Sequence, residues 1–227
     1  MIGIVLQARI GSTRLPGKVM MPLCGRPMLG HILDRLKSVG NADILVVATT
    51  NSPGDDIIDS FVRNEGIACF RGDEADVLDR YYRASAFFQL DHVVRATADN
   101  PFVDPEEIER LIVLHVGASA DFTHSLGQLP VGVGAECFTR HALERSSREG
   151  MLSHHREHVD EFILENPDLF HIEQLAVAPE KIAPGVRLTV DTPEDFSRAA
   201  EIYMALYQPA KHIKTQDAIR ICASLSA

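Results

Sequence analysis

Uninterrupted apolar runs alternate with amphipathic segments through the first half of the chain. The apolar runs predict buried strands at residues 2–8, 43–49, 67–70 and 92–97. The amphipathic segments predict helices at residues 27–39, 55–65, 75–89 and 105–116. This alternation predicts an α/β fold with a mostly parallel, doubly wound sheet, helices on both faces, and ligands bound at the carboxyl ends of the strands.

The alternation weakens after about residue 118. Strands are predicted at residues 121–125, 135–138, 171–177 and 186–190, and helices at residues 140–149 and 154–165. Thr192 and Asp195 form a capping-box pattern that opens a further helix. Because no internal repeat or low-complexity linker is visible, we expect a single domain over residues 1–227, with a small β excursion at residues 118–185.

The charge balance and the composition exclude several classes of protein. The chain has 22 Lys and Arg against 32 Asp and Glu, a net charge of −10, whereas binding to nucleic acid needs a broad basic surface. No stretch approaches the roughly 20 apolar residues of a membrane helix, and the four cysteines form no CxxC pair. We therefore expect a cytoplasmic protein with reduced thiols and with neither nucleic acid nor a membrane as its partner.

The N-terminal region reverses this charge balance. Its first 33 residues hold no acid and four cations, three of which (Arg9, Arg14 and Lys18) lie in the loop after the first strand. Gly11 and Ser12 allow close backbone approach, and a strand, such a loop and a helix are typical of phosphate binding. The loop is neither a Walker A motif, which needs Ser or Thr after its lysine, nor a GxGxxG fingerprint. We therefore expect a site for a small anionic ligand.

Two aspartates follow predicted strands further along the chain. Asp99 comes shortly after residues 92–97, and Asp191 directly after residues 186–190. Because both strand ends are expected at one edge of the sheet, the pair suits Mg²⁺, which prefers a few carboxylates together with phosphate oxygens and water. Each aspartate by itself could instead be a turn or cap residue. Asp195 is expected to be the helix cap partner, and Asp79 to pair with a neighbouring arginine.

The basic loop also carries a resemblance to a known family. The run from Gln7 to Lys18, QARIGSTRLPGK, closely resembles the N-terminal signature of the sugar-acid cytidylyltransferases, the family that contains the CMP-Kdo and CMP-neuraminate synthetases. Later stretches resemble further motifs of the family in their usual order, at residues 76–81, 95–101, 156–159 and 187–195. The resemblance is closest to the SpsF-like spore coat polysaccharide biosynthesis branch.

This resemblance implies an activity and partners. Such proteins have a Rossmann-like nucleotidyltransferase fold, usually form homodimers, and transfer CMP from CTP to a sugar acid with release of pyrophosphate. Residues 1–117 would then be the nucleotide-binding half, residues 118–185 would bind the acceptor and a second subunit, and residues 186–227 would supply a metal-binding strand end and C-terminal helices. The expected partners are CTP and a small anionic acceptor, with Mg²⁺ as the cofactor.

Residue roles are assigned from the matching motifs. Asp99 and Asp191 are expected to hold Mg²⁺. The expected catalytic residues, which neutralise the triphosphate and the leaving pyrophosphate, are Arg9, Arg14 and Lys18. The other expected nucleotide-binding residues are Gln7, Ala8, Gly11, Ser12, Arg71 and Arg80. The expected acceptor-binding residues are Arg95, Glu136, Arg156 and His158. For the arginines near strand ends, Arg71, Arg80 and Arg95, a place on the surface is an equal alternative.

Two departures from the family pattern leave the acceptor open. The segment at residues 130–136 lacks an acid that the family often has between its Gly and its Glu, and Thr97 stands where the Kdo branch has Gln. CMP-Kdo synthesis is therefore less expected than a related activity. His154, His155 and His158 lie close together but do not form HExxH, which favours an ordinary helix face over a zinc site.

Two alternative functions remain open. The first is a nucleotidyltransferase that acts on a sugar phosphate or polyol phosphate with another nucleotide. The second is a non-catalytic, nucleotide-binding regulatory subunit. Retention of Asp99, Asp191 and Lys18 argues against the second, because a site that has lost its activity usually loses a metal ligand or a loop cation first.

Overall fold

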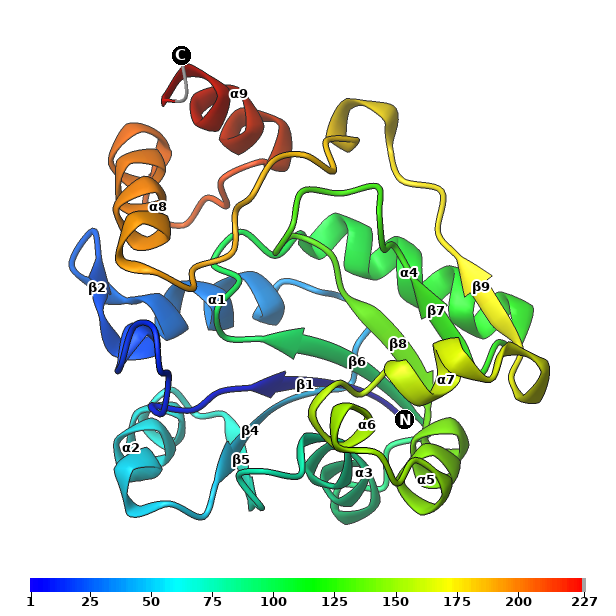
Figure 1. The fold of residues 1–227 in the computed structure, drawn as a ribbon. Helices are drawn as coiled ribbons and strands as arrows, with labels where there is room; N and C mark the ends of the chain where they lie inside the picture. The colour runs from blue at the N-terminus through cyan, green and yellow to red at the C-terminus, as the bar shows by residue number, and fades with distance from the viewer. Residues whose placement is uncertain (226–227) are drawn as a thin grey trace.

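The computed structural model describes residues 1–225 and shows one seven-stranded sheet (Figure 1). Its strand order is β5-β4-β1-β6-β8-β7-β9. The strands are β1 (Ile2–Gln7), β4 (Ile44–Thr50), β5 (Ala68–Gly72), β6 (His92–Thr97), β7 (Phe122–His124), β8 (Glu136–Thr139) and β9 (Ile172–Gln174). The four strands β5, β4, β1 and β6 are parallel, while β8 is antiparallel to β6 and β7. The predicted α/β fold class is confirmed.

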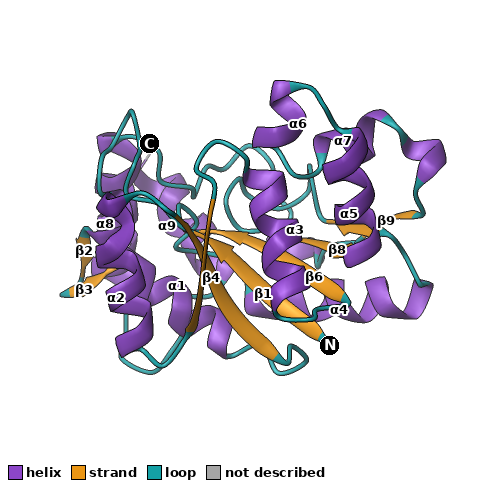
Figure 2. Ribbon diagram, turned by 90° about the horizontal axis from the view of Figure 1, so that it is seen from below, coloured by secondary structure: helices purple, strands orange, loops and turns teal. Residues whose placement is uncertain are grey.

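Helices cover both faces of the sheet, and Figure 2 shows α3 and α5 on the side opposite α1 and α4. The helices of more than five residues are α1 (Met28–Lys37), α2 (Asp56–Asn64), α3 (Val77–Phe87), α4 (Pro105–Ala118), α5 (Arg140–Glu149), α8 (Pro193–Leu206) and α9 (Thr215–Leu225). Successive side chains of a strand point to opposite faces. Ile4 and Leu6 of β1 accordingly pack with α1, while Val5 packs with α3 and α5.

None of the helices within residues 1–225 combines the length and the apolar character that crossing a bilayer requires.

A short antiparallel pair, β2 (Pro22–Leu23) with β3 (Arg26–Pro27), precedes α1 and was not predicted. Its strands are two residues each, too short to show a period-two pattern in the sequence.

The predicted helix at residues 154–165 is wrong. It is broken into α6 (Ser153–Glu157) and α7 (Glu161–Glu165), because the chain turns extended at His158, with φ −112° and ψ 112°. The side chain of the next residue, Val159, is fully buried in the core between α3 and α5. His154 and His158 therefore do not share a helix face.

The predicted strand at residues 186–190 is also wrong, because this segment does not join the sheet. The segment is extended, but it takes its backbone hydrogen bonds from loops: the N–H groups of Leu188 and Thr189 donate to Val131 O, and that of Val190 to Asp99 O. An isolated bridge between Val131 and Arg187 is its β-type pairing. These bonds nevertheless deliver the following residue, Asp191, to the end of β6.

Candidate active site

A pocket of about 570 Å³ opens at the carboxyl ends of β1 and β6. This volume lies within the roughly 300–1,000 Å³ of ordinary ligand sites. Its lining includes many of the residues expected from the sequence, namely Gln7, Ala8, Arg9, Gly11, Ser12, Arg14, Lys18, Arg95, Asp99, Glu136, His158 and Asp191. The predicted residues that do not line the pocket are Arg71, Arg80 and Arg156.

The basic loop is fixed to the sheet by a buried carboxylate that the sequence did not single out. Asp55, which is 2% exposed, accepts a hydrogen bond from Ile10 N at 2.7 Å and further bonds from Thr50. At the far end of the loop, Gly17 N donates to Ile10 O at 3.1 Å. Gly17 has φ +73°, a left-handed conformation that glycine adopts without strain. The loop is thus anchored at both ends while its cations face the pocket.

Lys18 lies between the two predicted metal ligands. Its Nζ is 3.0 Å from Asp191 Oδ1 and 3.6 Å from Asp99 Oδ2, and it donates to Val190 O at 2.6 Å. The lysine is buried, with 8% of its surface exposed. A single ammonium group that reaches both carboxylates shows that they are close enough to act on one small cation.

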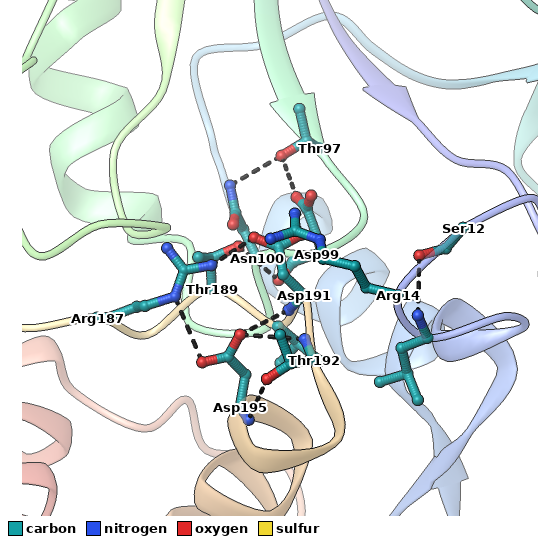
Figure 3. Close-up of polar contacts among 12 residues, drawn as sticks. Ser12, Arg14, Thr97, Asp99, Asn100, Arg187, Thr189, Asp191, Thr192 and Asp195 are labelled. Carbon is teal, nitrogen blue, oxygen red and sulfur yellow. Dashed lines mark hydrogen bonds and ion pairs between the residues drawn. The ribbon is translucent and has the colours of Figure 1, made fainter.

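Further cations hold Asp191 ionised. Arg14 Nη2 lies 3.1 Å from Asp191 Oδ1, and Arg187 donates to the other carboxylate oxygen (Figure 3). Burial alone would raise the pKa of Asp191, but the hydrogen bond and charge of Lys18, together with Arg14 and Arg187, hold it below its ordinary value. Arg187 was not predicted as a site residue, although it lies four residues before Asp191 in one of the family-like motifs.

Both aspartates are also oriented by further hydrogen bonds. The Thr97 hydroxyl donates to Asp99 Oδ1 at 2.5 Å, and Asn100 Nδ2 donates to that hydroxyl at 2.8 Å (Figure 3). The backbone N–H of Asp191 donates to Asp195 Oδ2 at 3.0 Å. Asp195 also completes the capping box of α8 with Thr192, so its predicted role as a cap partner is confirmed. The predicted pairing of Asp79 with an arginine is likewise observed, with Arg83.

The opposite wall of the pocket is built from β6 and β8. Arg95 and Glu136 are direct partners in the antiparallel register, and Arg95 Nη1 donates to Glu136 Oε2 at 2.6 Å. Their side chains are 17% and 11% exposed. Burial raises the pKa of Glu136 even though the Arg95 charge opposes this shift. The pair is therefore a strongly desolvated ion pair on the surface of the pocket.

The three predicted residues outside the pocket have structural contacts instead. Arg156 donates from Nε and Nη2 to Asp76 Oδ2, and from Nη1 to a backbone carbonyl. Arg71 donates to two backbone carbonyls and to the Asp56 carboxylate. Arg80 is fully buried and donates to Asp73 O. These contacts hold the loops around the pocket, and none of the three side chains lines it.

The donor set at the two aspartates fits Mg²⁺. Asp99 and Asp191 offer carboxylate oxygens, the hard ligands that this ion prefers, and the open pocket leaves room for phosphate oxygens and water. A separate group of possible ligands, His154, His155 and Glu165, lies outside the pocket. The Nε2 atoms of both histidines are hydrogen-bonded to the Glu165 carboxylate, at 2.8 and 2.7 Å, so this group joins α6 to α7.

A basic loop and two carboxylates at the strand ends of a doubly wound sheet define the site of a nucleotidyltransferase. Comparison of the chain with known protein families and structures leads to the same class. Residues 2–217 match the family described as Cytidylyltransferase, so this chain belongs to that family of nucleotidyltransferases. It is 37% identical over 212 residues to the spore coat polysaccharide biosynthesis protein SpsF of Bacillus subtilis, covering 91% of this chain and 86% of that protein. The resemblance found in the sequence is confirmed.

Solved structures share the fold. A cytidylyltransferase from Leptospira borgpetersenii superposes with a TM-score of 0.91 at 29% identity, covering 99% of this chain and 94% of that one. A CMP:2-keto-3-deoxy-manno-octonic acid synthetase complexed with CTP superposes with a TM-score of 0.70 at 19% identity, covering 90% and 98% of the two chains. The second likeness concerns the fold alone.

Proposed function

We propose that this protein is a Mg²⁺-dependent cytidylyltransferase that transfers CMP from CTP to a sugar acid or similar acceptor and releases pyrophosphate. The observation that carries the proposal is the position of Lys18, which contacts both Asp99 and Asp191 beside a loop that bears Arg9 and Arg14. This arrangement provides cations for a triphosphate and a carboxylate pair for a metal ion within one pocket. The SpsF relative supports a role in surface polysaccharide biosynthesis.

The chemistry requires positioning and charge neutralisation more than covalent catalysis. The acceptor hydroxyl oxygen bonds to the α-phosphorus of CTP while the bond to the pyrophosphate oxygen breaks and the hydroxyl proton is released. Arg9, Arg14 and Lys18 neutralise the triphosphate and the leaving pyrophosphate. Asp99 and Asp191 would hold Mg²⁺, which supplies further positive charge at the phosphates when it is bound.

Gln7 supports the proposal that the nucleotide bound in the pocket carries cytosine as its base. Its side chain lines the pocket, and its Oε1 atom is buried without a hydrogen-bond partner within residues 1–225. Leaving a buried acceptor unpaired costs about 1–3 kcal/mol, so a bound ligand that donates to it gains affinity. The exocyclic amine of cytosine is such a donor, whereas uracil carries an acceptor at the same position.

A homodimer is part of the proposal, and exposed apolar side chains in the excursion support it. Met151, Leu152 and Leu164 are 77%, 56% and 39% exposed around α6 and α7. Large apolar side chains that are exposed in one subunit gain stability when a second subunit buries them. Analytical ultracentrifugation of the wild type and of a Met151→Asp variant tests this: a monomeric wild type would remove the dimer from the proposal.

The function is tested by measuring pyrophosphate release with CTP, UTP, ATP and GTP across sugar acids, sugar phosphates and polyol phosphates. We expect release with CTP, an acid acceptor and Mg²⁺, and its loss in Asp99→Asn. Turnover with a phosphorylated acceptor and another nucleotide would instead establish the sugar phosphate alternative. Nucleotide binding without turnover on any acceptor would identify a regulatory subunit.

A further inference from the structure

A second cavity, of about 250 Å³, lies outside the pocket already described. It is bounded by α1, by the C-terminal end of α8 and by residues 207–213, which follow α8. Its lining includes His31, Arg35, Tyr203, Tyr207 and Lys211, none of which has a part in the proposed transfer of CMP. Its volume is just below the roughly 300–1,000 Å³ of ordinary ligand sites, so it suits a small ligand that stays partly at the surface.

Arg35 places an incompletely paired guanidinium group in the wall of the second cavity. Only 4% of this residue is exposed, and its Nε and Nη2 atoms donate to the backbone carbonyls of Val103 and Ile213, at 2.6 and 2.9 Å. The third nitrogen, Nη1, has no hydrogen-bond partner within residues 1–225, and no carboxylate of that range pairs with this arginine. Because a buried charge is costly unless it is paired, an anion that reaches Nη1 gains a charge-assisted hydrogen bond.

Lys211 supplies a second cation at the mouth of the second cavity. It is exposed, and its Nζ atom donates to a neutral partner, Gln208 Oε1, at 3.1 Å. The remaining carboxylate and ammonium groups of the wall, Asp34 and Lys37, each form an ion pair with a residue that does not line the cavity. The charge that the protein itself leaves unneutralised here is therefore positive, which favours an anionic ligand.

Aromatic rings form another part of the wall. The ring centroid of His31 lies 4.6 Å from that of Tyr203 and 5.1 Å from that of Tyr207. His31 and Tyr203 are buried, whereas Tyr207 is half-buried and keeps part of its ring accessible. An accessible aromatic ring can stack on another planar ring, including a nucleotide base. The rings and the two cations together suit a ligand that has both a planar ring and an acidic group.

The wall of the second cavity also contacts the segment that follows Asp99. Arg35 Nε donates to the backbone carbonyl four residues after Asp99, and the Tyr203 hydroxyl donates at 2.9 Å to the carbonyl two residues after it. Tyr203 belongs to α8, which begins two residues after Asp191. A ligand that shifts Arg35 or Tyr203 therefore acts on the backbone next to one aspartate and on the helix that follows the other.

We propose that the second cavity is a regulatory site for a small organic anion that carries a planar ring, such as a nucleoside monophosphate. Arg35 and Lys211 hold the anionic group, and the ring stacks on Tyr207. Occupancy of this site changes the affinity of Asp99 and Asp191 for Mg²⁺. The ligand site is independent of the proposed transfer reaction, whereas its effect on Mg²⁺ rests on the proposed metal site.

Calorimetric titration with AMP tests the ligand site, and adenosine and ribose 5-phosphate separate the contributions of the ring and the phosphate. Lys211→Glu reverses an exposed charge and should weaken the binding of AMP about tenfold. Tyr207→Leu should weaken the binding of AMP about threefold or more and leave that of ribose 5-phosphate within about twofold. Lys214→Glu, which reverses an exposed charge outside the cavity, is the matched control and should bind AMP as the wild type does.

A substitution in the first pocket shows where AMP binds. Arg14→Met removes an exposed cation of the basic loop and should leave the affinity of the second cavity for AMP within about threefold. Loss of AMP binding in Arg14→Met together with its retention in Lys211→Glu would place AMP in the first pocket and overturn the inference. The absence of AMP binding to the wild type would overturn it as well. Thermal unfolding checks that each variant is folded, and the two exposed lysines should have little effect on it.

Titration with MgCl₂ tests the regulatory effect. With AMP at saturation, the Kd for Mg²⁺ should change by about threefold or more in the wild type and stay constant in Lys211→Glu, after subtraction of the binding of Mg²⁺ to AMP alone. A Kd that AMP does not change would overturn the regulatory effect and leave the cytidylyltransferase function intact. The absence of Mg²⁺ binding in both proteins would overturn the proposed metal site and the regulatory effect with it, but not the site for AMP.

Discussion

Replacing Lys18 by methionine should make the nucleotide-free protein bind Mg²⁺ more tightly. Methionine keeps an unbranched side chain in a buried position but removes the charge that now lies between the two aspartates. In the wild type, we expect a metal ion at these carboxylates to compete with the ammonium group, which contacts both of them. Removing a residue from a binding site normally weakens the binding of the ligand. Tighter Mg²⁺ binding after the removal of Lys18 would therefore be specific to an arrangement in which the lysine and the metal ion compete.

The size of the effect follows from the distances. Lys18 Nζ lies 3.0 Å from Asp191 Oδ1 and 3.6 Å from Asp99 Oδ2, and unit charges about 4 Å apart near a protein surface interact by about 4 kcal/mol. The Asp99 side chain is 32% exposed, so water screens part of this interaction. We expect a net gain of about 1.4–2.8 kcal/mol, which is a 10- to 100-fold lower Kd for Mg²⁺.

Isothermal titration calorimetry with MgCl₂ and then with CTP measures both effects. CTP should bind about tenfold more weakly to Lys18→Met, because a charge-assisted hydrogen bond to phosphate contributes about 1.5–3 kcal/mol. Lys37→Met, which removes an exposed lysine outside the pocket that is paired with Glu65, is the matched control and should change neither affinity. A folded Lys18→Met variant with unchanged or weaker Mg²⁺ binding would refute the idea that the lysine and the metal compete.

Three further substitutions test the framework of the site. Gly132 has φ +91°, and in Gly132→Ala the added Cβ would lie 2.6 Å from a neighbouring backbone nitrogen. The unfolding temperature and the rate of pyrophosphate release should therefore both fall. Gly185→Ala, where the added Cβ meets open space, is the control and should behave as the wild type. Lys181→Met leaves the buried Asp104 without its cation, while Glu107 keeps its ion pair with Arg110, so the free energy of unfolding should fall by about 3 kcal/mol. Burial would raise the pKa of Asp104, but its bond to Lys181 holds the pKa below its ordinary value. The stability that this ion pair contributes is therefore present above about pH 4 and is lost as the pH falls through the pKa of Asp104 in the folded protein. In urea unfolding, the free energies of unfolding of the wild type and of Lys181→Met should converge below about pH 4. A difference that stays constant with pH would contradict this expectation. Asp55→Ala removes the buried anchor of the basic loop and should weaken CTP binding about tenfold in calorimetry, and an unchanged affinity would mean that the loop keeps its shape without it.

The first half of the fold could be predicted from the sequence because its strands are buried on both faces. Such strands are continuous apolar runs, as at residues 44–47, and the helices between them are amphipathic. The basic loop could also be located, because its charges contrast with an acidic chain. Asp99 and Asp191 were brought together as expected, since both follow segments that end at the same edge of the sheet.

The other features of the fold and of the site depend on contacts between residues far apart in the sequence, which a local sequence pattern cannot predict. Arg156 and Asp76 are 80 residues apart, and their pairing, which ties α6 to the start of α3, has no signal in the sequence. The break in the predicted helix at residues 154–165 follows from the burial of Val159 against distant helices, although the local sequence favours a continuous helix. Glu157, the last residue of α6, lines the pocket but was not among the residues expected from the sequence.

The contact between Lys18 and Asp191 joins residues that are 173 positions apart. At a synthesis rate of about 5–20 residues per second, roughly 9 to 35 seconds separate their appearance on the growing chain. During that time the basic loop has neither its aspartate partner nor the backbone carbonyl of Val190. A chain that stops before Asp191 would contain the strands of the sheet and the loop cations but only half of the carboxylate pair. The proposed metal site can therefore form only after Asp191 has been synthesised and has folded back onto Lys18.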